Sequence, residues 1–335
     1  MTTHTAARPQ AGADVTSAPA RGPRSAVRAA RTPRRPSRGS FEAARRRLFW
    51  PFVLPALILF TVLMLIPLVG TSWISLQNWP GAGPMEWVGL KNYLYLVRDP
   101  TFLKSFTNSG LVVLVAGAGV FAGSFILLAL MKDMIGRGRA FARAVVFFPV
   151  IIPGIVLSIV WGFLFQADGL VNEVLTSVGI SDPPAWLSQE NRFGVILLGI
   201  IWFSTGFYAT VLLAGADQIP PYLYEDCALA GANMWQRFRY VTLPLSWDVI
   251  TVCAVLWTIN ALKTFEFILA IAGSSSGLPD PATWTIALYT YASVFNPAGI
   301  PSYGRGAASA LVMLALIGVL VVLIRRIMRR ESIEM

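Results

Sequence analysis

The stretch that decides the fold is 213-LAGADQIPPYLYEDCALAGANMWQRFRYVTLP-244. Its Pro-Pro pair at 220–221 favours the start of a helix, because a proline in the first helical turn loses no hydrogen bond. Glu225 and Asp226 follow in the first turns, where a carboxylate complements the helix dipole. Small residues surround Gly231, which permits a sharp change of chain direction. The pattern predicts a helix–turn–helix of low side-chain bulk, and such a surface suits docking into a groove on another protein. A plain connecting loop is the alternative that the composition leaves open.

Six segments of the chain are long and apolar enough to cross a bilayer, which takes about 20 residues. They cover residues 50–76, 106–131, 144–166, 193–215, 249–271 and 307–324, so the quoted stretch joins the fourth to the fifth. The chain is 55% hydrophobic and 13% charged, whereas an average soluble domain is about 25% charged. We therefore predict an all-α membrane protein with six transmembrane helices.

Basic residues in the connections set the orientation, because cytoplasmic loops carry the excess of Lys and Arg. With the N-terminus inside, the inside segments hold 21 Lys and Arg, and the outside loops hold five. When residues 1–49 are left out, the inside segments still hold ten Lys and Arg, against five in the outside loops. Both termini are therefore expected to be cytoplasmic, and residues 216–248 form a connection on the same side.

The net charge of +10 resides almost wholly in a tail, residues 1–49, which hold eleven Arg against two acids. This composition of Ala, Pro, Arg, Ser and Thr cannot build a core, so we expect the tail to be disordered. Three Arg at 45–47 precede Leu-Phe-Trp at 48–50, an arrangement that suits lipid headgroups rather than nucleic acid. The transmembrane domain then covers 50–325, and a short cytoplasmic tail covers 326–335.

Several classes of chemistry are excluded by the residues that the body of the chain lacks. The single histidine, His4, lies in the tail, which removes His-based triads, metal sites and proton relays. Cys227 and Cys253 have no CxxC or zinc spacing, and no GxxxxGK[ST] run exists to hold ATP. Residues 273–277 fit GxSxG, but a nucleophile elbow needs a strand and a histidine. We expect no catalytic residue, no metal site and no cofactor in this chain.

The quoted stretch resembles the EAA loop of ABC-importer permease subunits, whose pattern is Glu-Ala-Ala-x-x-Asp-Gly-Ala, then an aromatic residue, a branched aliphatic residue and Leu-Pro. The matching positions are Glu225, Gly231, Ala232, Phe238, Val241, Leu243 and Pro244. Three positions depart from it: Asp226 and Cys227 replace the two Ala residues, and Ala230 replaces the Asp. The loop therefore lacks one family carboxylate and gains another.

The resemblance extends over roughly residues 50–325 and points to sugar permeases of the MalF-like type. The stretches that carry it are Pro51–Pro55, Gly89–Tyr93, Gly169–Asn172, Trp186-Leu187, Thr264–Glu266, Gly273, Thr283–Tyr291 and Gly306–Ala310. The usual Gly-Gly-Gly-Pro is replaced by residues 273–277. The resemblance implies the type I ABC-importer permease fold, in a bacterial or archaeal plasma membrane.

Such a subunit, by resemblance, pairs with a second homologous permease and sits on two cytoplasmic ATPases. It receives solute from an extracytoplasmic binding protein. The partner ATPases hold ATP and Mg, so the resemblance implies that this chain is not an enzyme. The EAA helix fits a cleft in the ATPase and couples nucleotide binding to alternating access. The residues implied in this coupling are Glu225, Asp226, Ala228, Gly231, Ala232, Phe238, Leu243 and Pro244.

Polar and aromatic residues inside spans are the candidates for the solute path, because polar groups are costly in a membrane. Asn260 and Lys263 share a helix face and Trp257 lies one turn earlier, which suits a sugar. Alternatively, Lys263 pairs with Glu266, and Asn260 links two helices. The full set of candidates is Trp202, Tyr208, Trp257, Asn260, Lys263 and Glu266.

We therefore predict a solute-translocating subunit of an ATP-driven importer, for a sugar or an oligosaccharide. A permease for glycerol phosphate or another polyol is the alternative within the family. Phosphate would need cations in the path, and Lys263 is the only one inside a span. An ion-coupled secondary carrier would need intramembrane acids, of which Glu266 alone qualifies. A membrane-embedded enzyme would need a cluster of Asp, Glu or His, which the spans do not offer.

Overall fold

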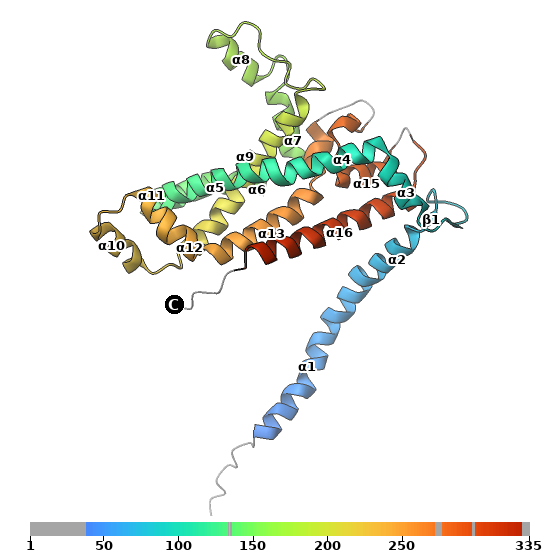
Figure 1. Ribbon diagram of the computed structural model, residues 1–335, viewed down its shortest axis with the longest axis horizontal. Coiled ribbons are helices and arrows are strands. Elements are labelled where there is room, and N and C mark those ends of the chain that lie inside the picture. Colours follow the sequence, from blue (N-terminus) through green and yellow to red (C-terminus); the bar gives the residue numbers. More distant parts are fainter. Residues whose placement is uncertain (1–37, 133, 135, 272–276, 297–298, 330–335) are drawn as a thin grey trace, which may run out of the picture. The chain divides into compact units, whose positions relative to one another are not determined.

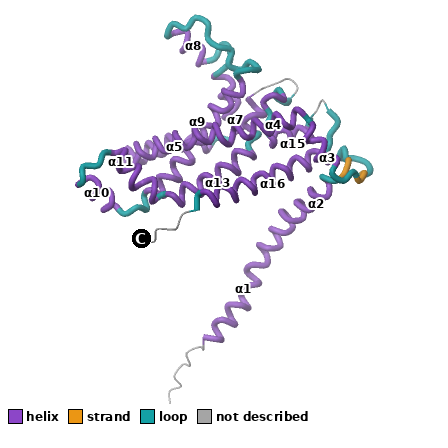
Figure 2. The backbone as a smooth tube through the Cα atoms, viewed as in Figure 1, coloured by secondary structure: helices purple, strands orange, loops and turns teal. Residues whose placement is uncertain are grey.

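The chain folds almost wholly into helices, as Figures 1 and 2 show for the computed structural model. The structure describes residues 38–132, 134, 136–271, 277–296 and 299–329. Within these ranges the strands are β1 (Gln77–Asn78) and β2 (Glu86–Trp87), which form one antiparallel pair. The predicted all-α class is confirmed.

The chain divides into two units, residues 1–59 and 60–335. In the first unit, helix α1 (Arg38–Phe60) begins inside the stretch that we predicted as a disordered tail to residue 49. The helix starts early because residues 43–47 are Ala-Ala-Arg-Arg-Arg, all good helix formers. The predicted disorder of residues 1–37 lies outside the described residues.

Four helical segments are long and apolar enough to cross a membrane, and two bent helix pairs bring the number to six. The four are Phe49–Ile74, made of α1, η1 (Thr61–Leu65) and α2 (Ile66–Ile74); Pro100–Lys132, made of α4 (Pro100–Leu111), η2 (Val112–Ala116) and α5 (Gly117–Lys132); α9 (Arg192–Ala216); and α16 (Tyr303–Ile327). The bent pairs are α6 (Gly136–Ile151) with α7 (Gly154–Leu164), at 97°, and Met234–Leu245 with α13 (Trp247–Lys263), at 74°.

Two of the predicted spans are broken rather than continuous. The span at 144–166 breaks at Pro153, because proline lacks an N–H and disfavours helical backbone in the residue before it. The span at 249–271 breaks at Thr264, whose backbone is extended at φ −67° and ψ 116°. The chain then resumes as α14 (Glu266–Ile271). Nothing in the composition of residues 249–271 marks this second break.

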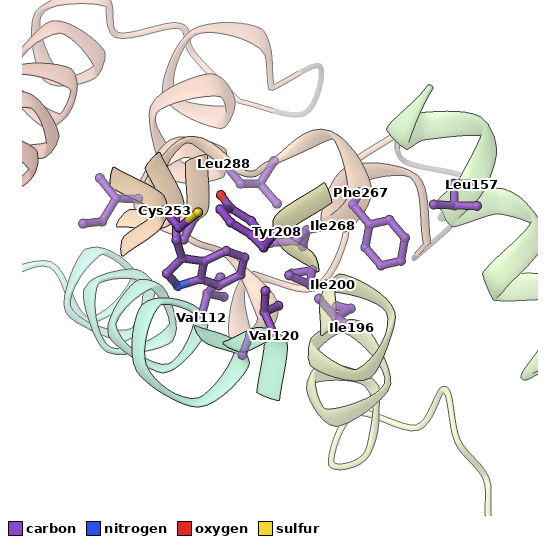
Figure 3. Close-up of a cluster of buried hydrophobic side chains, with 14 of the residues drawn as sticks. Val112, Val120, Leu157, Ile196, Ile200, Tyr208, Cys253, Phe267, Ile268 and Leu288 are labelled. Carbon is purple, nitrogen blue, oxygen red and sulfur yellow. The ribbon is translucent and has the colours of Figure 1, made fainter. Parts of the chain in front are cut away.

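The core of the second unit is built on the contact between α5 and α9. Glycines allow the close approach: a Cβ on Gly119 would lie 2.7 Å from Ile201, and one on Gly206 would overlap the carbonyl oxygen of Val146 on α6. Figure 3 shows the side chains that fill this core. Those labelled are Val112, Val120, Leu157, Ile196, Ile200, Tyr208, Cys253, Phe267, Ile268 and Leu288.

Short elements connect the spans at the end opposite to α10 and α11 in Figure 1, or project from the bundle. They are α3 (Lys91–Arg98), α8 (Leu170–Ser177), η4 (Pro281–Thr283) and α15 (Ile286–Phe295). Buried amides hold two of them: Asn92 donates to the carbonyls of Ser75 and Gln77, both at 2.8 Å, and Trp186 Nε1 donates to Asn172 Oδ1 at 2.8 Å. These contacts give structural reasons for Asn92, Asn172 and Trp186 in the resembling stretches. The expected change of turn at 273–277 lies outside the described residues except at Gly277, whose φ is 80°.

We predict that Gly206→Ala destabilises the protein by about 1–3 kcal/mol, because the added methyl group forces α6 away from α9. Thermal unfolding in detergent measures the effect. Gly194→Ala on the same helix is the control, because a Cβ there meets nothing within 4 Å. The control is expected to be neutral or stabilising by about 0.4–1 kcal/mol. Equal stability of the two variants would refute the packing argument.

Candidate functional site

The helix–turn–helix predicted from the sequence lies at one end of the second unit, on the left in Figure 1. Its first arm is α10 (Pro221–Leu229), and the turn is at Gly231, whose φ of 78° favours glycine. The amides of Gly231 and Ala232 donate to the carbonyls of Ala228 and Cys227, at 3.0 and 2.9 Å. These two bonds form a Schellman motif, which ends the helix sharply.

The second arm consists of α11 (Met234–Arg237), η3 (Phe238–Thr242) and α12 (Leu243–Leu245). It starts with a capping box, in which the side chains of Asn233 and Gln236 bond each other's backbone amides. Phe238 is buried, stacks on Trp235 at 5.6 Å between ring centroids and meets Phe125 of α5 edge-on at 6.0 Å. The aromatic contacts attach this arm to a membrane span.

The first arm, by contrast, exposes most of its surface. No residue of α10 is buried, and Leu229 is 89% exposed beside small residues. An apolar side chain projecting from a smooth helix suits contact with another protein. The exposed members of the predicted coupling set are Glu225, Asp226, Ala228 and Gly231. Phe238 is buried, and Ala232, Leu243 and Pro244 are half-buried, so these four support the segment from within.

A charged cluster that the sequence reasoning missed lies behind α10. Asp217 follows α9 and accepts two hydrogen bonds from Arg139 Nη2, at 2.6 and 2.8 Å. Lys132 Nζ lies 3.2 Å and Arg143 Nη2 lies 3.5 Å from the same carboxylate. Partial burial would raise the pKa of Asp217, but the hydrogen bonds from Arg139 and Lys132 outweigh it and lower the pKa. The carboxylate is therefore ionised at neutral pH.

A cavity of roughly 370 Å³ lies between the broken span α6–α7, the long helix α9 and α13. Its wall is formed by Pro149, Val150, Ile152, Gly154, Leu157, Phe203, Ser204, Phe207, Tyr208, Trp257, Asn260, Ala261 and Thr264. Both helix breaks, at Pro153 and Thr264, therefore adjoin it. The carbonyl that the second break frees accepts a hydrogen bond from Thr285 Oγ1 at 3.1 Å. Non-helical backbone at membrane depth is tolerated where it lines such a cavity.

Three of the predicted solute-path residues meet at this cavity. Tyr208 is 2% exposed, and its hydroxyl lies beside the side chain of Asn260 with no partner in hydrogen-bond geometry. The Asn260 side chain is exposed at the wall. Trp257 packs edge-on against Tyr208 at 5.8 Å, and its indole donates to the Val113 carbonyl of η2 at 2.9 Å. The cavity wall thus exposes an amide, with a buried phenol hydroxyl and an aromatic ring beside it.

The other three predicted solute-path residues lie outside the cavity wall. Trp202 is half-exposed and stacks on Trp161 at 5.2 Å. Lys263 and Glu266 are both exposed, and the structure shows no ion pair between these two described residues. The Glu266 carboxylate instead lies near Gly154 at the start of α7, where it complements the helix dipole. Within the described ranges, no three His, Cys, Asp or Glu side chains are grouped to hold a metal.

The comparison with protein families matches residues 119–332 to the binding-protein-dependent transport system inner membrane component. The osmoprotective compounds uptake permease protein GgtC of Synechocystis is 31% identical, over 84% of this chain and 100% of that protein. The trehalose/maltose transport system permease protein MalF of Thermococcus litoralis is 33% identical, over 81% and 90%. The alpha-glucoside transport system permease protein AglF of Rhizobium meliloti is 30% identical, over 89% of each.

Solved structures match the fold. A chain of a bacterial ABC transporter involved in the import of the acidic polysaccharide alginate gives a TM-score of 0.72 at 24% identity, over 88% of this chain and 100% of that chain. The alginate transporter in complex with a periplasmic protein that carries an alginate pentasaccharide gives 0.71 at 23%, with the same coverage. The expected type I ABC-importer permease fold is confirmed.

We predict that Trp257→Phe destabilises the protein by about 1–3 kcal/mol, because the Val113 carbonyl loses its indole donor inside the bundle. Trp202→Phe is the matched control, since Trp202 is half-exposed, and we expect a smaller loss. Thermal unfolding in detergent compares the two. A Trp257→Phe protein as stable as the control would show that the indole hydrogen bond contributes nothing to stability.

Proposed function

The chain belongs to the family of binding-protein-dependent transport inner membrane components, and on this premise we propose that its solute is a sugar or an oligosaccharide. It is the permease subunit of an ABC importer, a multi-pass protein of the inner membrane. The sugar proposal is supported by the relatives for trehalose and maltose and for alpha-glucosides. The observation on which the sugar proposal rests is the cavity, where the Asn260 amide and the Tyr208 hydroxyl adjoin the ring of Trp257.

The chemistry of the cavity favours a neutral polar solute over a phosphorylated one. A sugar presents hydroxyl groups, which an amide and a phenol hydroxyl can bind as donor and acceptor. A polyol phosphate needs cations, and Lys263 is not part of the wall. The absence of Glu266 from the wall likewise removes the acid that an ion-coupled carrier would use. Among the described residues that line the cavity, none is charged.

The proposed coupling surface is the exposed face of α10, which docks into a cleft of a partner ATPase. Glu225, Asp226, Ala228 and Gly231 contact the partner, while Ala232, Phe238, Leu243 and Pro244 support the segment. The departures from the family pattern fit this division. Asp226 adds a charge to the exposed face, and Ala230 lies at the end of the helix beside the Gly231 turn.

The proposed assembly contains a second permease subunit, two ATPases that bind ATP and Mg, and an extracytoplasmic binding protein. This chain binds no nucleotide or other cofactor of its own and no nucleic acid. Both termini and the 216–248 connection face the cytoplasm, so α10 reaches the ATPases. Apolar side chains on the outer faces of the spans, such as Leu114, Phe148 and Val319, contact lipid or the second permease.

Replacing Gly231 by Val tests the docking role. The left-handed turn disfavours a branched side chain, and the added bulk projects from the docking face, where nothing of this chain lies within 4 Å. We expect the ATPases to be lost on purification or ATP hydrolysis to be uncoupled from uptake, and the same of Glu225→Ala. Gly179→Val, at another left-handed and open glycine in an external loop, is the matched control. Wild-type uptake and ATPase stimulation in both test variants would refute docking through α10.

Asn260→Leu and Tyr208→Phe test the solute cavity. Each removes one hydrogen-bonding group from the wall, so we expect the KM for uptake to rise about tenfold. Uptake of radiolabelled maltose, trehalose and lactose into cells that express the complete transporter is the assay, with glycerol 3-phosphate as the phosphorylated comparison. Trp202→Phe, outside the wall, serves as the control. An unchanged KM in both variants, or uptake of glycerol 3-phosphate alone, would contradict the sugar site.

A further inference from the structure

Helix α10 is joined to the spans by a contact between Lys132 and Tyr224. The ammonium of Lys132, the last residue of α5, lies 5.0 Å from the centre of the Tyr224 ring. The Tyr224 hydroxyl is 3.1 Å from Thr242 Oγ1 in the second arm. A void of about 20 Å³, room for about one water, adjoins these residues. These contacts add to the packing of Leu223, Tyr224 and Cys227 against the core, which is the apolar part of the attachment of α10.

The same ammonium binds the end of α9. Lys132 Nζ donates to the Ala216 carbonyl at 2.7 Å and to Asp217 Oδ1 at 3.2 Å. A cation at a helix C-terminus is favoured by the dipole. One flexible side chain therefore contacts α10 on one side and the end of α9 on the other.

Asp217 continues the connection to α6. Its carboxylate receives the two hydrogen bonds from Arg139, near the start of α6. Ten residues later the same helix reaches Pro149 and Val150 in the cavity wall, about 15 Å along the axis at 1.5 Å per residue. Tyr208, on α9, also lines the cavity. Both helices held by Asp217 thus contribute to the cavity wall, α6 at its C-terminal end and α9 near its middle.

We infer that Lys132 and Asp217 are positioning residues that transmit the movement of α10 to α6 and α9, and so to the cavity wall. The inference rests on the proposed docking of α10 to the ATPase and names the contacts inside this chain that carry the movement onward. The chain of contacts is Tyr224, Lys132, Asp217 and Arg139. Charge is scarce in this protein, at 13% of residues, yet three cations converge on one acid at this point.

The test measures the movement of each helix separately, in the complete transporter in lipid nanodiscs. Cys227 and Cys253 are replaced by Ser. Spin labels are placed at Lys104→Cys on α4 as reference, and at either Tyr222→Cys on α10 or Val145→Cys on α6, all at exposed positions outside the proposed docking residues. Distances are recorded by pulsed electron paramagnetic resonance, first without nucleotide and then with ATP. Mg²⁺ is left out, so that the ATP is bound but not hydrolysed.

In the otherwise unsubstituted chain we expect ATP to shift both distances. In Lys132→Gln the α10 distance still shifts, and the shift of α6 is lost. Lys132→Arg retains both shifts, because guanidinium also binds a carbonyl, a carboxylate and an aromatic face. Arg139→Gln removes the two shortest bonds between α6 and Asp217 and leaves only the 3.5 Å contact of Arg143, so it loses most of the α6 shift as well. Arg137→Gln is the control, an exposed cation on the same helix, and retains both.

Persistence of the α6 shift in Lys132→Gln and Arg139→Gln would overturn the inference. Loss of the α10 shift in Lys132→Gln would also overturn it, since Lys132 would then position the docking helix alone. If Lys132→Gln does not assemble, Arg139→Gln decides by the same readout. If α10 does not move in the unsubstituted chain, the proposed docking through α10 is wrong, and the inference is wrong with it. If α10 moves and α6 moves independently of Lys132 and Arg139, only the inference is wrong.

Discussion

A backbone amide or carbonyl inside a bilayer must find its partner within the protein, and the rest of this structure depends on that constraint. It keeps the spans helical, and the breaks at Pro153 and Thr264 lie beside one cavity. The Thr285 hydroxyl satisfies the carbonyl freed at the second break. The breaks in turn make room for the cavity, where the Asn260 amide and the Tyr208 hydroxyl can bind a solute. The proposed solute site therefore lies where the helices are allowed to end.

The scarcity of charge gives the few charged groups distinct tasks. In the cavity the described lining residues are uncharged. A neutral sugar that leaves the proposed site therefore leaves no unpaired charge in the wall. At the end of the second unit that carries α10, Lys132, Arg139 and Arg143 gather on Asp217 and tie three helices together. Glu225 and Asp226 remain exposed on α10. The proposed solute site, the charged linkage between helices and the proposed docking helix thus occupy separate parts of the chain, and the linkage lies between the other two.

Local chemistry could be predicted from the sequence, whereas long-range contacts could not. The spans follow from apolar length, and the turn at Gly231 follows from its lack of a side chain. Tyr208, Trp257 and Asn260 were found because polar or aromatic residues inside spans are few. The break at Thr264 was missed because its satisfying partner, Thr285, lies 21 residues away. The alternative pairing of Lys263 with Glu266 assumed one continuous helix, and the break at Thr264 separates the two residues. The cluster on Asp217 joins residues about 80 positions apart, which no local pattern reveals.

The central claim is that this chain provides the path for the solute but not the energy. The energy comes from ATP hydrolysis in the partner ATPases and reaches this chain through α10. Reconstitution of the permease pair in liposomes, with and without the ATPases and with the binding protein outside, tests it most directly. The account predicts accumulation of sugar only when the ATPases and ATP are present on the side of α10. Accumulation against a gradient by the permeases alone, or driven by an ion gradient, would contradict it.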